Sequence, residues 1–166
     1  MPLTAESKTA NILKSLNAHF HTNLVTADSL QVHFPGRREL FTPSGATWVQ
    51  LTYLLGTARQ RYARVDENSR GGGIVTGIIN LNCCELVAQR TNRYALASLR
   101  DTVYNRIAPP KTITIQDYDT GGNPTTGYFV ILDLDENDVQ DGHGPDDNGI
   151  AILNLSASGH YIEAYT

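Results

Sequence analysis

The sequence has little charge, little sulfur and no long apolar run. Charged residues make up 18% of its 166 positions, and it holds two cysteines and one methionine. No apolar run approaches the roughly 20 residues of a membrane-spanning helix, and the start, MPLTAESKTANIL, lacks the pattern of a secretory signal. We therefore expect a protein without a membrane partner, made and kept in a cytoplasm or built into something assembled there. At this length we expect one domain, residues 1–166, with a sizeable core.

The scarcity of cysteine limits redox and metal chemistry. Cys83 and Cys84 are neighbours, and neighbours on a strand point to opposite faces, so a disulfide between them would be strained. No Lys, Arg or His lies nearby until Arg90 to lower the pKa of either thiol. We expect two reduced thiols without a catalytic role.

Basic residues are absent from the last third of the chain. All 13 Lys and Arg lie at or before Lys111, against seven acidic residues there, whereas ten acidic residues and no Lys or Arg follow. The first part therefore carries +6 and the second −10. This division indicates a basic and an acidic surface that meet within the chain or between copies, unless it is an accident of composition.

Periodicity predicts an α+β fold. Helical spacing of apolar residues predicts helices over 5–22 and 85–107, the second stopped by two prolines. Two long strands around a glycine-rich turn, DENSRGGG, predict a β-hairpin that protrudes from the domain. We expect a mostly antiparallel sheet with the two main helices packed on one face. The expected strands are 29–34, 47–65, 74–83, 112–118 and two or three more within 127–166.

The stretch HFPGRRELFTPSGATWVQL combines an exposed loop with the only tryptophan of the chain. We expect Trp48 to seal the core under one of the helices, at the entry of a central strand. The loop before it would then be held on a rigid body, where loops commonly carry function. Arg37, Arg38 and Glu39 are therefore candidate protein-docking residues.

An acidic segment, residues 133–149, begins like a calcium-binding loop. Asp133, Asp135 and Asn137 have the required alternate spacing, but Asp138 stands where glycine is needed and Gly144 where a carboxylate is needed. A solvated acidic loop is the favoured interpretation, because turn-forming residues are frequent there. An irregular calcium site stays open, with the candidate ligands Asp135, Asp141, Asp146 and Asp147. The same four residues are candidates for contact with another protein.

No other pattern predicts chemistry. The histidines have no zinc-site spacing, the glycine-rich run leads into a strand instead of a helix, and no nucleophile turn is present. We expect no cofactor, no metal and no enzyme. Arg59, Arg61 and Arg64, with Tyr62 among them, fit single-stranded nucleic acid, but the pI of about 5.6 and the acidic last third favour protein contact.

The order of these features resembles the tail terminator, or tail completion, proteins of long-tailed bacteriophages. The resemblance rests on an N-terminal helix, a strand ending in FPG, a loop with Phe41 and Pro43, WVQLTYLLG, an arginine-rich strand, RGGGIVTGIINL, and a helix before a proline stop. It covers about residues 7–118 and leaves the acidic part, 119–166, outside the pattern.

The resemblance implies a structural virion protein that is not an enzyme. Such proteins form a ring, commonly a hexamer, at the head-proximal end of the tail tube. The ring ends tube polymerisation and contacts neck proteins, and phage DNA passes through it without specific binding. The alternatives are another ring-forming neck or tail-tube component, or a single-stranded nucleic-acid-binding module.

Overall fold

The computed structural model describes most of the chain. It covers residues 3–4, 9–36, 41–61, 72–90, 92, 94–118, 124–135 and 149–164. At 3–4, 9, 57–61, 72–73, 117–118, 124–126 and 162–164 only the backbone is described. The helices are α1 (Thr9–Phe20), a π-helix η1 (His21–Ala27), a 3-10 turn η2 (Val87–Gln89) and α2 (Ala95–Ile107). The strands are β1 (Leu3–Thr4), β2 (Val32–His33), β3 (Thr47–Arg61), β4 (Gly72–Leu86), β5 (Lys111–Tyr118), β6 (Pro124–Asp135) and β7 (Ile150–Ala164).

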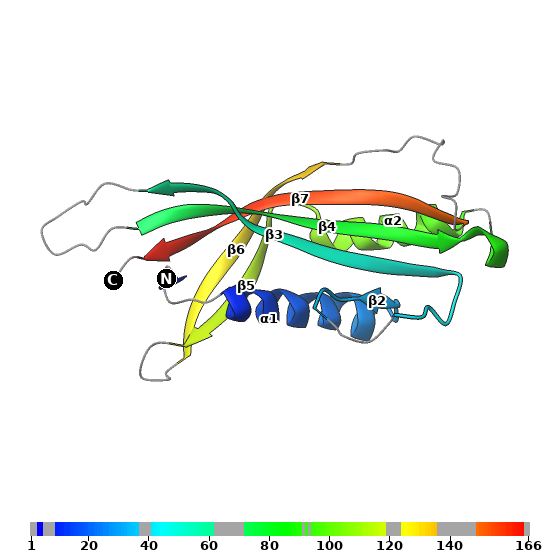
Figure 1. The fold of residues 1–166 in the computed structure, drawn as a ribbon, viewed down its shortest axis with the longest axis horizontal. Coiled ribbons are helices and arrows are strands. Elements are labelled where there is room, and N and C mark those ends of the chain that lie inside the picture. Colours follow the sequence, from blue (N-terminus) through cyan, green and yellow to red (C-terminus); the bar gives the residue numbers. More distant parts are fainter. Residues whose placement is uncertain are drawn as a thin grey trace, which may run out of the picture.

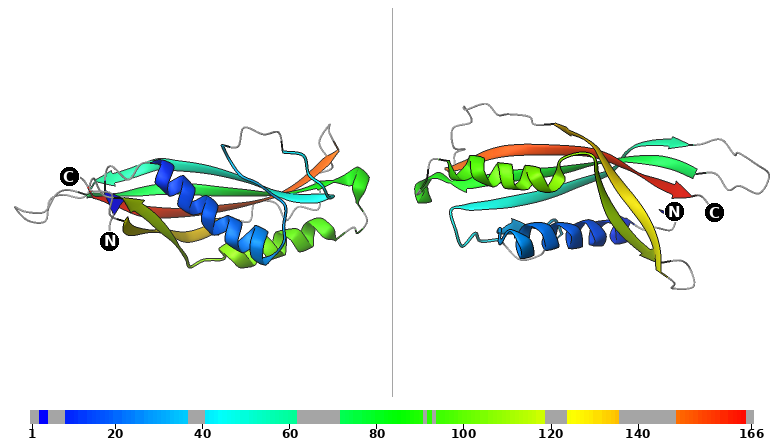
Figure 2. Two further views of the ribbon diagram at one scale, coloured as in Figure 1. Left: turned by 90° about the horizontal axis from the view of Figure 1, so that it is seen from below. Right: turned by 180° about the vertical axis from the view of Figure 1, so that it is seen from behind.

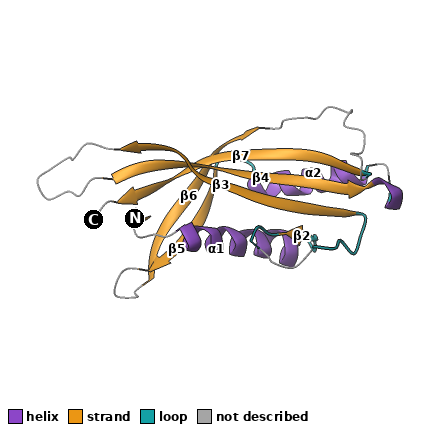
Figure 3. Ribbon diagram, in the orientation of Figure 1, coloured by secondary structure: helices purple, strands orange, loops and turns teal. Residues whose placement is uncertain are grey.

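The strands form one seven-stranded sheet in the order β2-β3-β4-β7-β6-β5, with β1 also on β7 (Figure 1). The short strands pair in parallel with longer ones, β1 with β7 and β2 with β3. Every other pair of strands is antiparallel. Figures 2 and 3 show that β5 and β6 swing away from the direction of the other long strands, so the sheet is curled. A mixed fold with two main helices and a mostly antiparallel sheet is thus confirmed.

Alternating side chains of the sheet join both helices in one hydrophobic cluster. Val49, Cys83 and Leu153 stand side by side on β3, β4 and β7, and the same odd-numbered positions continue along these strands. The amphipathic spacing of each helix supplies the other side of the cluster. The helical members are Ile12, Leu16 and Phe20 from α1, with Leu99, Val103 and Ile107 from α2.

The second helix begins ten residues later than its pattern predicts. Residues 85 and 86 still belong to β4, because both edges of that strand are paired, with β3 up to Glu85 and with β7 up to Leu86. The backbone then makes η2, and α2 starts only at Ala95. The prediction that this helix begins at residue 85 is therefore wrong, and sheet pairing is the reason.

The other helix and strand boundaries lie closer to the predicted ones. The first helical region continues past its predicted end at residue 22 as η1, whereas residues 5–8 lie outside the described part. The predicted strand at 29–34 is only Val32–His33, although Val32 and Phe34 are buried in the expected alternation. The C-terminal region forms one long strand, β7.

A phenylalanine packs against two glycines where β6 crosses the sheet. Gly77 and Gly159 are partners on β4 and β7. A Cβ atom on Gly159 would lie 2.5 Å from the Phe129 ring and 2.5 Å from the carbonyl oxygen of Val130, and one on Gly77 would lie 2.9 Å from the same ring. Real side chains do not approach so closely, so only glycine fits at Gly159.

We expect Gly159→Ala to lower the free energy of unfolding by roughly 2 to 3 kcal/mol, because the new methyl group meets backbone as well as a ring. Thermal unfolding should show a loss of about 5 to 10 °C. Ser158→Ala, one position away on the same strand, is the control and should change little. Equal melting temperatures for the two variants would contradict this account.

Candidate assembly surface

The strand that carries Arg59 and Arg61 has one edge that is mostly unpaired among the described residues. β3 pairs with β4 along its whole length, but β2 covers its other edge only at Val49 and Gln50. In the described part of the chain no strand pairs with that edge from Leu51 to Arg61. Open edges of this kind are sites at which another chain can add.

The predicted contact arginines lie at the far end of β3. Arg59 and Arg61 are in register with Val75 and Gly73, after a bulge at Gly56 and Thr57. Gly56 has a φ of +77°, which suits glycine and allows the strand to continue beyond the bulge. Arg64 lies outside the described residues, as does most of the predicted hairpin tip.

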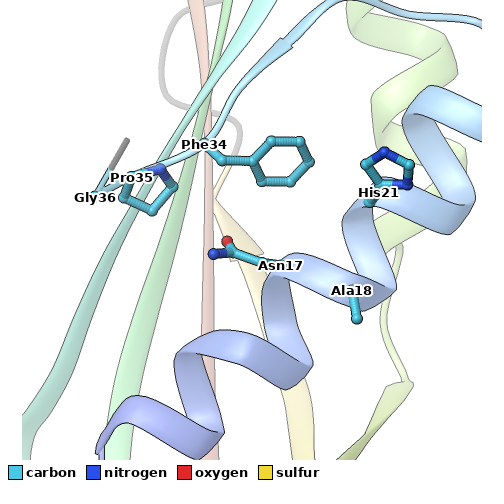
Figure 4. A pocket seen from close by; sticks show the side chains of 6 residues that line it. All are labelled: Asn17, Ala18, His21, Phe34, Pro35 and Gly36. Carbon is cyan, nitrogen blue, oxygen red and sulfur yellow. The ribbon is translucent and has the colours of Figure 1, made fainter. Parts of the chain in front are cut away.

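A pocket of about 380 Å³ lies directly before the loop that is expected to dock another protein (Figure 4). It is formed between α1, the start of η1 and the segment Phe34–Gly36. Phe34 is almost fully buried and stacks on His21, with ring centroids 6.1 Å apart. Gly36 turns the chain with a φ of +81°. Arg37, Arg38 and Glu39 follow directly in sequence but lie outside the described residues.

An aromatic column holds the other end of the same loop. The Phe41 ring lies 5.0 Å from His33 on β2 and 6.4 Å from Trp48 on β3, centroid to centroid. Trp48 is buried, yet it is paired with Cys84 and so occupies the face of β3 opposite to Val49, outside the main hydrophobic cluster. The predicted position of Trp48 under a helix is therefore wrong. Trp48 instead anchors the loop.

The acidic candidates fall mostly outside the described residues. Asp135 is exposed near the end of β6, in register with Ser156 on β7. Asp141, Asp146 and Asp147 are not described, so the calcium hypothesis stays a prediction. Within the ranges that the structure covers, no group of three or more His, Cys, Asp or Glu side chains is placed to hold a metal ion.

The two cysteines do not form a disulfide with each other and lie on opposite faces of β4, as their adjacency predicts. Both are buried. Burial, together with the neighbouring Cys84, raises the pKa of Cys83 to about 12. A thiol of this kind stays protonated at neutral pH, which is the opposite of what a nucleophile requires.

An ion pair links α2 to the end of η1. The Arg106 guanidinium donates two hydrogen bonds to the Asp28 carboxylate, one of them from Nε at 2.8 Å. These bonds hold the pKa of Asp28 below its ordinary value. The two residues are 78 positions apart, so no local pattern could have predicted the contact.

A second ion pair fixes the connection between β4 and α2. Arg90 donates from Nε at 2.9 Å and from Nη2 at 2.6 Å to one oxygen of Glu85, whose side chain is fully buried. Among the described residues, the other oxygen of Glu85, Oε1, has no hydrogen-bond partner. Arg90 is therefore the partner that compensates the buried carboxylate of Glu85.

No protein family model and no curated protein matches this chain. Neither α1 nor α2, nor any other helix among the described residues, has the length and apolarity that crossing a membrane requires. The candidate assembly surface comprises an open strand edge and a loop with a pocket beside Phe34, and the sequence adds an unequal distribution of charge.

We expect Asp28→Asn to lower the free energy of unfolding at pH 7 by roughly 1 kcal/mol, because Arg106 loses a charged partner. The folded-state pKa of Asp28 is depressed, so its contribution is present above its ordinary value of 3.8 and is lost as the pH falls through the folded-state pKa. Urea unfolding at several pH values should show the two proteins converging in acid. Asp101→Asn is the control, since that carboxylate is 67% exposed and should contribute little. A difference that does not become smaller as the pH falls below 3.8 would contradict the assignment.

We expect Arg90→Ala to destabilise the fold by roughly 2 to 3 kcal/mol, because it leaves the buried Glu85 carboxylate uncompensated. Adding Glu85→Gln to this variant removes the charge and should restore part of the loss. Urea unfolding of both variants measures the difference. A double variant less stable than Arg90→Ala alone would show that the charge of Glu85 is compensated elsewhere.

Proposed function

We propose that this chain is a structural virion protein that assembles into a ring of six copies at the head-proximal end of a phage tail tube. In this role it ends tube polymerisation, joins the tail to a neck or head-completion protein, and lets DNA pass without specific binding. The proposal includes the finer fold features: both helices on one face of the sheet and a β3–β4 hairpin that protrudes. It also includes a location in the virion and the absence of catalysis.

The observation that carries the proposal is the open edge of β3 ending in Arg59 and Arg61. A long unpaired edge is a liability unless another chain covers it. The division of charge at Lys111 supplies complementary surfaces on one molecule. Contacts between two different surfaces run head to tail, and they close into a ring when the rotation between copies allows it.

The single hydrophobic cluster supports the finer fold features. Side chains from α1 and α2 join it together with one alternating set of sheet positions, which is the arrangement that two helices on one face produce. The 15 residues of β3 and the 15 of β4 supply the length that a protruding hairpin needs.

In this proposal Arg59, Arg61 and Arg64 meet carboxylates of an adjacent subunit or of a neck protein. The candidate loop residues Arg37, Arg38 and Glu39 dock on the next ring of the virion. The exposed Asp135 and the acidic residues after it belong to the complementary surface, and they also keep phosphate binding weak, because DNA affinity grows with cationic contacts.

We expect charge reversal of Arg59, Arg61 and Arg64 to glutamate to abolish ring formation. Mass photometry and negative-stain images of the purified wild-type protein should show a closed ring, and the variant should remain monomeric. Lys14→Glu, at an exposed position on α1, is the control and should leave the ring intact.

Two results would contradict the proposal. One is a wild-type protein that stays monomeric at high concentration and on isolated tail tubes. The other is a salt-dependent retention of single-stranded oligonucleotide that the triple variant loses, since this would favour the nucleic-acid-binding alternative.

A further inference from the structure

The second sheet edge, β5, lies beside α1 (Figures 1 and 2). Residues of α1, η1 and β5 line a groove between them. The groove has a volume of about 370 Å³. One side is a stripe of α1 and η1 that includes Ser15 and His19, and the other side is the exposed alternate residues of β5, Thr112, Thr114 and Gln116. We call this groove the β5 slot.

The backbone groups of β5 that face the slot can be assigned from one contact. The N–H of Gln116 donates to Ser15 Oγ at 3.0 Å, so the backbone polar groups of Gln116 point away from β6. In an antiparallel pair these directions alternate with a period of two residues. The N–H and C=O groups of Thr114 and Thr112 therefore also point away from β6, toward the slot.

These outward groups have no partner among the described residues. Backbone bonds outside the regular strand and helix pairings are found elsewhere in the described fold, and none involves Thr112 or Thr114. At one end Ser15 closes the slot by bonding to Gln116. At the other end Pro110 has no N–H to offer. The slot thus presents the outward N–H and C=O groups of two residues, Thr112 and Thr114. These are enough to bind a short added strand.

A positive charge lies beside the slot. Lys111 begins β5 and lies close enough to His19 that it helps burial to lower the pKa of that imidazole. None of the residues that line the slot carries a carboxylate. An incoming segment with acidic side chains is therefore complementary to it.

We propose that the β5 slot binds the acidic segment of a second copy of this chain, residues 136–148, which adds as a short strand to Thr112 and Thr114. Main-chain hydrogen bonds give such strand addition its affinity, and neighbouring side chains give it specificity. The inference rests on the proposed self-assembly and names its contact.

The chain itself supplies the reason for choosing a second copy. Residues 136–148 carry five carboxylates and no Lys or Arg. The five are Glu136, Asp138, Asp141, Asp146 and Asp147. A slot on one copy and an acidic segment on the next form a head-to-tail contact, the type that a closed ring requires.

The test uses a fluorescent synthetic peptide with the sequence of residues 136–148 and the full-length protein. Thr114→Pro removes an N–H that no described group uses, at an edge position where proline is tolerated. Thr114→Val keeps the N–H and removes only the hydroxyl. We expect the proline variant to bind the peptide about tenfold more weakly, and the valine variant to bind like the wild type.

Two further measurements guard against misfolding and against unspecific attraction. The backbone amide NMR resonances of Thr112 and Thr114 in the wild-type protein should shift when the peptide is added. This measurement needs no variant. A peptide with Asn and Gln in place of its acidic residues should lose binding. No saturable binding, no shift of these two resonances, or equal binding by the two Thr114 variants would overturn the proposal.

The fate of the ring is measured separately. If the Thr114→Pro variant still forms the ring that the wild-type protein forms, the proposal that a second copy occupies the slot is overturned. If the peptide binds in the manner expected but the wild-type chain never forms a ring, the proposed function fails and the slot stands as a contact between two copies. If the ring forms and the peptide does not bind, the slot fails alone.

Discussion

The close approach of Phe129 to the paired glycines Gly77 and Gly159 is the constraint on which the shape of the sheet depends. β6 pairs with β7 only from Val130 onward, whereas its residues before that point pair with β5 alone. The crossing therefore happens where the Phe129 ring and a backbone carbonyl lie directly over Gly159. A larger residue there would push β6 away from β7, and β5, which is held by β6, would move with it.

The curl has a consequence for both edges of the sheet. Because β5 is carried away from the direction of β7, its outer edge meets α1, where Ser15 bonds to the backbone of Gln116. The far end of β7, which β6 has left, is covered instead by β1. A contact between one aromatic ring and two glycines thus decides which edge groups are satisfied and which face the slot.

Local patterns predicted most of the elements but not the contacts between them. The sequence predicted the alternation of Val32 and Phe34 and the helical spacing after Ala95, because each pattern depends only on neighbours in sequence. The extension of β4 through Glu85 was not, since it depends on pairing with strands on both sides. Gly77 and Gly159 carry no local signal at all, because their role is fixed by a phenylalanine that is distant in sequence from both.

The candidate surface was predictable to the same degree. The sequence identified the loop before Trp48 and the arginines of β3, because composition marks exposed and basic segments. It misplaced Trp48, since the choice of face depends on register with Cys84, and it missed the pocket at Phe34, which needs α1 in position. The pairing of Asp28 with Arg106 is likewise a product of the tertiary fold.

The two edges of the sheet differ in a way that bears on assembly. If both were open, copies could add to each other edge to edge without limit, and if both were closed, no strand contact would be available. Here the β3 edge is open over about ten residues, from Leu51 to Arg61, whereas Ser15 and Pro110 confine the β5 edge to two outward residues. Since these edges stand at opposite ends of the strand order, one molecule carries two different contact surfaces. Different surfaces favour head-to-tail contacts over two-fold pairing, and the limited length of the slot opposes continuous growth of the sheet.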